Sequence, residues 1–100
     1  MRFCNWAADW YFLGIATTTR TMGEVKSNAR NVDFGPANVG EREAVTYREA
    51  ARQDHCDVAF EIPGEFILIR VEKKGSKEVR EDPCVVAIRS ATVMDRYLPR

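Results

Sequence analysis

The most regular pattern of apolar and polar residues lies in the second half of the chain. Val58, Phe60 and Ile62 recur at every second position, as in a strand with one buried face. Residues 63–64 are Pro-Gly and predict a tight turn. Residues 66–69 are apolar without interruption, which predicts a central strand that is covered on both faces.

A third apolar run follows at residues 84–88, after a charged stretch. Residues 73–77 combine lysines with a glycine and predict a turn. Residues 78–82 are mostly charged and lead through Pro83 into the apolar run, which predicts another buried strand. We therefore predict a three-stranded antiparallel meander over residues 57–89.

The first half of the chain has a weaker pattern. Residues 10–20 are rich in aromatic side chains and threonine, which predicts a strand, with a short turn or helix before it. Residues 23–40 contain several glycine, asparagine and proline residues and few apolar ones, so they are predicted to be mostly loop, with a short strand as the alternative within them. A loop of this length in a small domain is often functional.

Two segments are predicted to be helical. Residues 41–55 favour a helix, or a short strand that leads into one, because Thr46 and Glu49 have the spacing of a capping box. Residues 90–98 are the second segment, since Ser90 can cap a helix whose apolar side chains share one face.

Together these elements predict the fold class. We expect an α+β domain with an antiparallel sheet of about four strands and one or two short helices packed on one face. The 100 residues are expected to form a single compact domain, because two cores within this length would each be too small to be stable alone.

The balance of acidic and basic residues argues against some classes of binding partner. Fifteen basic and fifteen acidic residues give a formal net charge of zero. A nucleic-acid-binding domain usually carries a basic excess, so strong direct binding to nucleic acid is not expected. Low net charge gives weak repulsion between copies, so self-association is expected. The apolar stretch at residues 10–16 is too short to span a bilayer, and no membrane partner is predicted.

The cysteines are Cys4, Cys56 and Cys84, an odd number without close spacing. This pattern argues against a disulfide framework and predicts thiols in a reducing compartment. The predicted location is therefore the cytoplasm.

The stretch 54–57 contains the single histidine, His55, beside Cys56. Neighbouring side chains on a strand point to opposite faces, so a nucleophilic pair would have to join His55 to Cys4 or Cys84. The three cysteines and the histidine also match a zinc ligand count, but they lack the paired spacing of a zinc knuckle. We therefore expect no catalytic residue, metal or cofactor, and no enzymatic activity.

The function expected from these absences is protein binding. The chain is interpreted as an adaptor or inhibitor that covers a surface of a larger protein partner, because aromatic and arginine anchors are plentiful. A phage- or mobile-element-encoded inhibitor of the anti-CRISPR type, with a host nucleoprotein complex as partner, has this size and composition. The alternatives are a small RNA-binding domain with stacking aromatics, or a cysteine-dependent enzyme. The predicted partner-binding residues are Trp6, Trp10, Tyr11, Arg20, Arg80 and Glu81.

Overall fold

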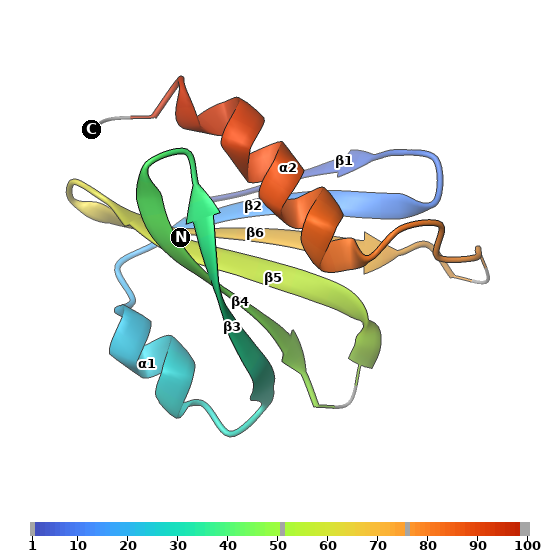
Figure 1. Ribbon diagram of the computed structural model, residues 1–100, viewed down its shortest axis with the longest axis horizontal. Helices are drawn as coiled ribbons and strands as arrows, with labels where there is room; N and C mark the ends of the chain where they lie inside the picture. The colour runs from blue at the N-terminus through green and yellow to red at the C-terminus, as the bar shows by residue number, and fades with distance from the viewer. Residues whose placement is uncertain (1, 51, 76, 99–100) are drawn as a thin grey trace.

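A single antiparallel sheet organises the computed structural model, which describes residues 2–50, 52–75 and 77–98 (Figure 1). Within these residues the sheet has six strands in the order β1-β2-β6-β5-β4-β3. The strands are β1 (Arg2–Ala7), β2 (Tyr11–Thr18), β3 (Asn31–Val39), β4 (Arg42–Glu49), β5 (Arg52–Ile62) and β6 (Glu65–Lys73). The helices are α1 (Met22–Ser27) and α2 (Pro83–Asp95).

The α+β class and the antiparallel sheet are confirmed, as are three of the predicted elements. The threonine-rich strand is β2, and the alternating segment lies in β5. The turn between β5 and β6 passes through Gly64 at φ 81°, a left-handed conformation that glycine adopts without strain. Residues 66–69 lie in β6, which pairs with β2 on one side and β5 on the other and is therefore central.

The predicted strand at residues 84–88 is wrong, because this segment is the first half of α2. Asp82 caps the helix by accepting the Cys84 N–H at 2.9 Å, and Pro83 occupies the first turn. The buried positions of the helix recur at helical spacing, so packing against the sheet overrides the strand preference of the β-branched side chains. Those positions are Pro83, Val86, Ala87, Ala91 and Asp95.

The predicted helix at residues 41–55 is also wrong. This segment forms β4 and the start of β5, and β4 has a paired neighbour on each side. The Thr46 hydroxyl donates to the Gly35 carbonyl at 3.4 Å instead of capping a helix. The predicted loop contains α1 and β3, and the predicted N-terminal turn is β1. Ala51 and Ser76 fall in predicted elements but lie outside the described residues.

The strand count and the placement of the helices differ from the prediction as well. The described sheet has six strands instead of four, and the two helices lie on opposite faces. Helix α2 packs on the face that carries Val58, Phe60 and Ile69. Helix α1 places Val25 on the other face, against Ala59 and neighbouring side chains.

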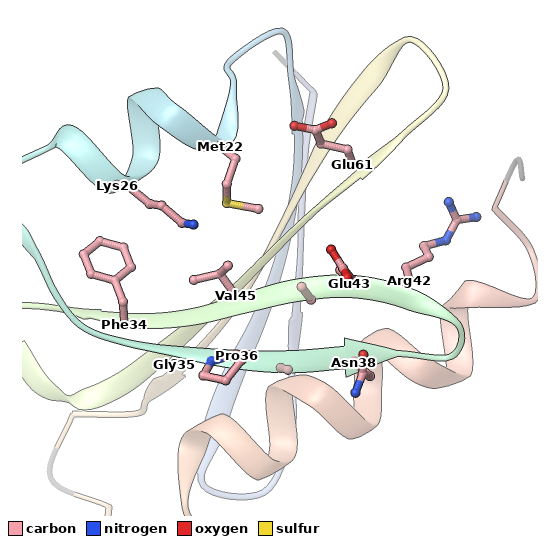
Figure 2. A pocket seen from close by; sticks show the side chains of 12 residues that line it. Met22, Lys26, Phe34, Gly35, Pro36, Asn38, Arg42, Glu43, Val45 and Glu61 are labelled. Atoms are coloured by element: carbon pink, nitrogen blue, oxygen red, sulfur yellow. The ribbon is translucent and has the colours of Figure 1, made fainter.

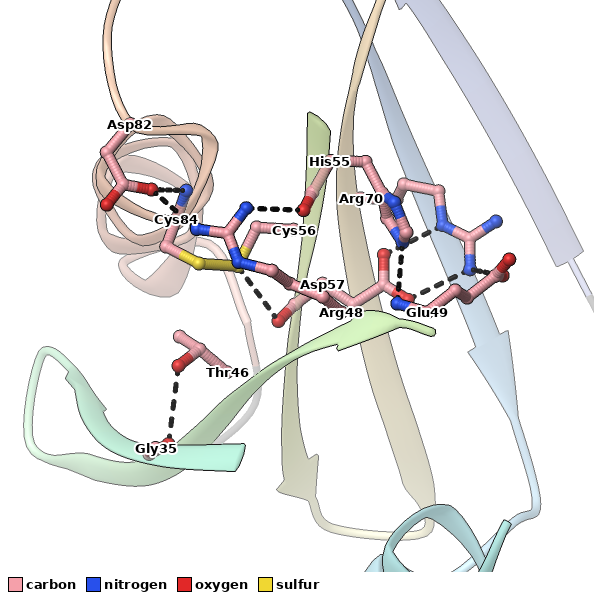
Figure 3. Close-up of a disulfide and its surroundings, with 10 residues drawn as sticks. All are labelled: Gly35, Thr46, Arg48, Glu49, His55, Cys56, Asp57, Arg70, Asp82 and Cys84. Carbon is pink, nitrogen blue, oxygen red and sulfur yellow. Dashed lines mark hydrogen bonds and ion pairs between the residues drawn. A yellow bond between two sulfur atoms is a disulfide. The ribbon is translucent and has the colours of Figure 1, made fainter. Parts of the chain in front are cut away.

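A disulfide fastens the first turn of α2 to β5 (Figure 3). Cys56 and Cys84 are bonded, whereas Cys4 is a free, exposed thiol on β1. The prediction of three free thiols is therefore wrong for two of them. The pairing could not be predicted from the sequence, because the two cysteines are far apart along the chain. Cys56 is buried on β5, and Cys84 reaches it only because residues 83–95 form a helix across the sheet.

An ion pair fastens the other end of α2. Asp95 in the last turn accepts a hydrogen bond from Arg42 Nε at 2.6 Å, and both side chains are nearly buried. Gly40 lies in the β3–β4 turn at φ 61°, where an added Cβ would collide with the Asp95 carboxylate. The β3–β4 turn therefore packs directly against the end of α2.

We predict that losing the disulfide weakens the fold without changing its topology. Cys84→Ser should lower the free energy of unfolding by about 2–4 kcal/mol, because the bond closes a long loop in the unfolded chain. Chemical denaturation with and without a reductant measures this, and the reductant should have no further effect on Cys84→Ser. Cys4→Ser is the control and should unfold like the parent; equal stability of all three proteins would contradict the prediction.

Candidate functional site

The face of the sheet opposite α2 is only partly covered. Helix α1 is a short element with a single buried residue, Val25, which packs among Tyr47, Ala59 and Phe66. Its two flanks border two separate hollows. Met22 and Lys26 line the first, and Glu24 and Asn28 line the second.

The first hollow, which we call the α1 groove, has a volume of about 1060 Å³. Figure 2 shows side chains from α1, β3, β4 and β5 around it. Met22, Phe34, Pro36 and Val45 contribute apolar side chains to it, and Phe34 is 40% exposed. An apolar hollow rimmed by charged groups is typical of a protein-binding site.

Two carboxylates line the α1 groove from different strands. Glu43 comes from β4 and Glu61 from β5, beyond the point at which the pairing of these strands ends with Val45 and Ala59. Both glutamates are exposed, and neither takes part in an ion pair within the described residues. An exposed carboxylate without an ion pair can bind a basic side chain of another molecule.

The groove lies beside the protected edge of the sheet. Edge strand β3 contains Pro36, which has no N–H, and its register shifts between Val32 and Gly35. Asp33 within that irregularity has φ 55°. These features hinder the pairing of another strand with the backbone of β3. A partner in the groove would therefore contact mainly side chains.

A network of three charged side chains, one of them buried, lines the second hollow (Figure 3). Arg70 on β6 donates from Nε and Nη2 to the two oxygens of Asp57, at 2.7 and 2.9 Å, and from Nη2 to Glu49 at 3.0 Å. Asp57 is almost fully buried, and its hydrogen bond raises the pKa of the Arg70 guanidinium. These three charges therefore hold strands β4, β5 and β6 together.

The histidine and the free thiol lie far apart. His55 is buried on β5, where its Nε2 accepts the Glu49 N–H at 3.3 Å. Cys4 lies on the edge strand β1, three strand positions away, which is about 14 Å at the usual strand spacing. The two side chains also belong to opposite faces, and Cys84 is bonded to Cys56. The structure therefore contains neither the His55–Cys4 pair nor the His55–Cys84 pair that a nucleophilic site would have needed.

A family model matches residues 1–96 of the sequence. The chain belongs to the DUF3558 family. That family is described only as a protein of unknown function. No curated protein and no solved structure matches the chain.

The aromatic residues predicted to bind a partner have different environments in this member of the family. Trp6 on β1 is 52% exposed, whereas Trp10 is 4% exposed and belongs to the core under α2. Tyr11 is half-buried, with its ring 4.9 Å from that of Trp10. Of the three, Trp6 is therefore the one that is available as a surface anchor.

The predicted charged residues do not form one rim. Arg80 forms an ion pair with Asp9 at 2.8 Å, which brings the segment before α2 to the turn that follows Trp6. Glu81 is bound instead by Arg89 of α2, a contact that lowers the pKa of Glu81. Arg20 lies in the β2–α1 connection and lines the second hollow.

Two features of the described residues concern membranes and metals. Neither helix of residues 2–50, 52–75 and 77–98 has the length and apolar character needed to cross a bilayer. Within the same residues, no three His, Cys, Asp or Glu side chains are grouped so that they could hold a metal ion.

We predict that the two tryptophans affect stability very differently. Trp10→Ala should lower the free energy of unfolding by about 3–5 kcal/mol, because it empties a buried site. Trp6→Ala should change it by less than about 1 kcal/mol, because the side chain is largely in water. Urea denaturation of both variants is the measurement, and comparable losses would place Trp6 in the core as well.

Proposed function

We propose that the chain is a protein-binding module without enzymatic activity, an adaptor or inhibitor that covers a surface of a larger partner. The α1 groove is the site that we propose for this contact. The observation that carries the proposal is that Glu43 and Glu61, neither of them in an ion pair within the described residues, line the same hollow as the exposed apolar side chain of Phe34.

The groove chemistry indicates what the partner segment contains. An apolar side chain would lie on Met22, Phe34 and Val45 and exclude water there. A lysine or arginine of the partner close to that side chain would bind the carboxylate of Glu43 or Glu61. A buried apolar anchor with a charged rim is the usual composition of such contacts.

The RNA-binding alternative has less support. Lys74 lies 5.5 Å from the centre of the exposed Phe12 ring, which is a suitable contact for a base. However, Phe12 and Trp6 belong to opposite faces of the β1–β2 hairpin and do not form a common stacking surface.

The disulfide indicates the kind of cellular compartment in which such a module would function. Disulfides persist in oxidising compartments, so the Cys56–Cys84 bond favours an oxidising environment over the cytoplasm that the sequence led us to expect. The cytoplasmic location, the phage origin and the anti-CRISPR role stay predictions without support from the groove. Self-association likewise stays a prediction.

A peptide-display selection on the immobilised protein tests the proposal. We expect the selected peptides to share an apolar residue and a nearby lysine or arginine. The double variant Glu43→Gln/Glu61→Gln should weaken their binding at least tenfold, since two charged contacts are lost together. Glu65→Gln changes an exposed glutamate outside the groove in the same way and is the matched control.

Stability gives an independent readout for the same variants. Glu61→Gln and Glu65→Gln should each change the free energy of unfolding by less than about 0.5 kcal/mol, because both side chains are exposed, so weaker peptide binding by the double variant would not reflect a loss of folding. Peptides that bind the double variant as tightly as the parent, or a selection without basic residues, would disprove the groove as the binding site.

A further inference from the structure

The second hollow, on the other flank of α1, is a pocket of about 440 Å³. Its lining is mainly polar, in contrast to the α1 groove. Arg20 comes from the connection before α1, and Asn28 and Arg30 come from the connection after it. Tyr47 on β4 and Arg70 on β6 lie on the sheet beneath them. We call this hollow the arginine pocket.

The carboxylates of the arginine pocket are engaged within the protein. Both oxygens of Asp57 accept from Arg70, and Glu49 accepts from the same guanidinium. Glu24 accepts a hydrogen bond from the Thr21 hydroxyl at 3.4 Å. The acidic groups that line the pocket therefore already have donors.

Several donors of the pocket, in contrast, have no acceptor. Within residues 2–50, 52–75 and 77–98, neither the Arg20 nor the Arg30 guanidinium forms an ion pair or a hydrogen bond. Tyr47 is only 4% exposed, and its hydroxyl has no hydrogen-bond partner among the same residues. The hydroxyl is not among the fully buried atoms that lack a partner in the described residues, so it is accessible from the pocket and can donate to a molecule that enters it.

The protonation of Tyr47 agrees with a donor role. Burial is the main cause that raises the pKa of its hydroxyl, and the nearby Asp57 carboxylate acts in the same direction. The phenol therefore keeps its proton throughout the physiological range and can donate one hydrogen bond to a ligand.

We propose that the arginine pocket binds a small oxyanion, the carboxylate or phosphate group of a small-molecule ligand, through Arg20, Arg30 and Tyr47. Guanidinium groups match the paired oxygens of carboxylates and phosphates, and a phenol adds a further directed hydrogen bond. Three arginines and three carboxylates line the pocket, so its net charge is zero. The anion is therefore held by directed donors and not by a general positive field.

Titration followed by nuclear magnetic resonance tests this site. Sodium phosphate and sodium acetate are added in separate experiments at constant ionic strength, with sodium chloride as the reference. We expect at least one oxyanion to shift the Arg20 and Arg30 side-chain signals with saturation, while chloride does not. Saturation by phosphate alone identifies a phosphate ligand, and saturation by acetate alone identifies a carboxylate ligand.

Two conservative variants separate ligand binding from folding. Tyr47→Phe removes only the hydroxyl and should weaken oxyanion binding roughly tenfold, the usual effect of losing one hydrogen bond to a charged group. Tyr11→Phe is the matched control, because Tyr11 is half-buried outside the pocket. Arg30→Gln should also weaken binding, whereas Arg96→Gln on the exposed end of α2 should not. Equal shifts with chloride, or unchanged binding by Tyr47→Phe, would overturn the proposal.

Discussion

The fold depends on the attachment of α2 at both ends. The Cys56–Cys84 bond ties its first turn to the centre of the sheet, and the Arg42–Asp95 ion pair ties its last turn to the β3–β4 hairpin. Between these points Val86, Ala87 and Ala91 pack on the sheet. Because α2 covers only one face, the opposite face is left to the much shorter α1.

The short α1 divides that opposite face into two sites with different chemistry. Its one buried residue, Val25, packs with Tyr47 on the sheet, and the helix is too short to cover more. Tyr47 lies between the two hollows: its ring contacts Phe34 of the α1 groove, and its hydroxyl belongs to the arginine pocket. One side chain thus contributes to an apolar surface for a protein segment and to a polar pocket for a small anion.

The sequence correctly predicted the strands whose pattern of apolar residues matches their burial in the sheet. The predictions were wrong where contacts between distant segments determine the secondary structure. The alternation in β5 and the apolar run in β6 are visible because these strands are central. Residues 84–88 are apolar and mostly β-branched, and only the Asp82-Pro83 pair before them indicated a helix start. The α1 groove and the disulfide depend on packing between distant segments that no local pattern contains.

The charged residues of the described chain fall into two groups, and this division separates structural from functional roles. Asp57 and Asp95 are nearly buried, and each has a close arginine partner, because an isolated buried charge would be strongly destabilising. Glu43 and Glu61 are exposed, and neither forms an ion pair among the described residues. A charge that serves no contact within the protein is available to act on another molecule. The two glutamates that border the α1 groove therefore have no evident role in folding, and binding to another molecule is the better explanation for them.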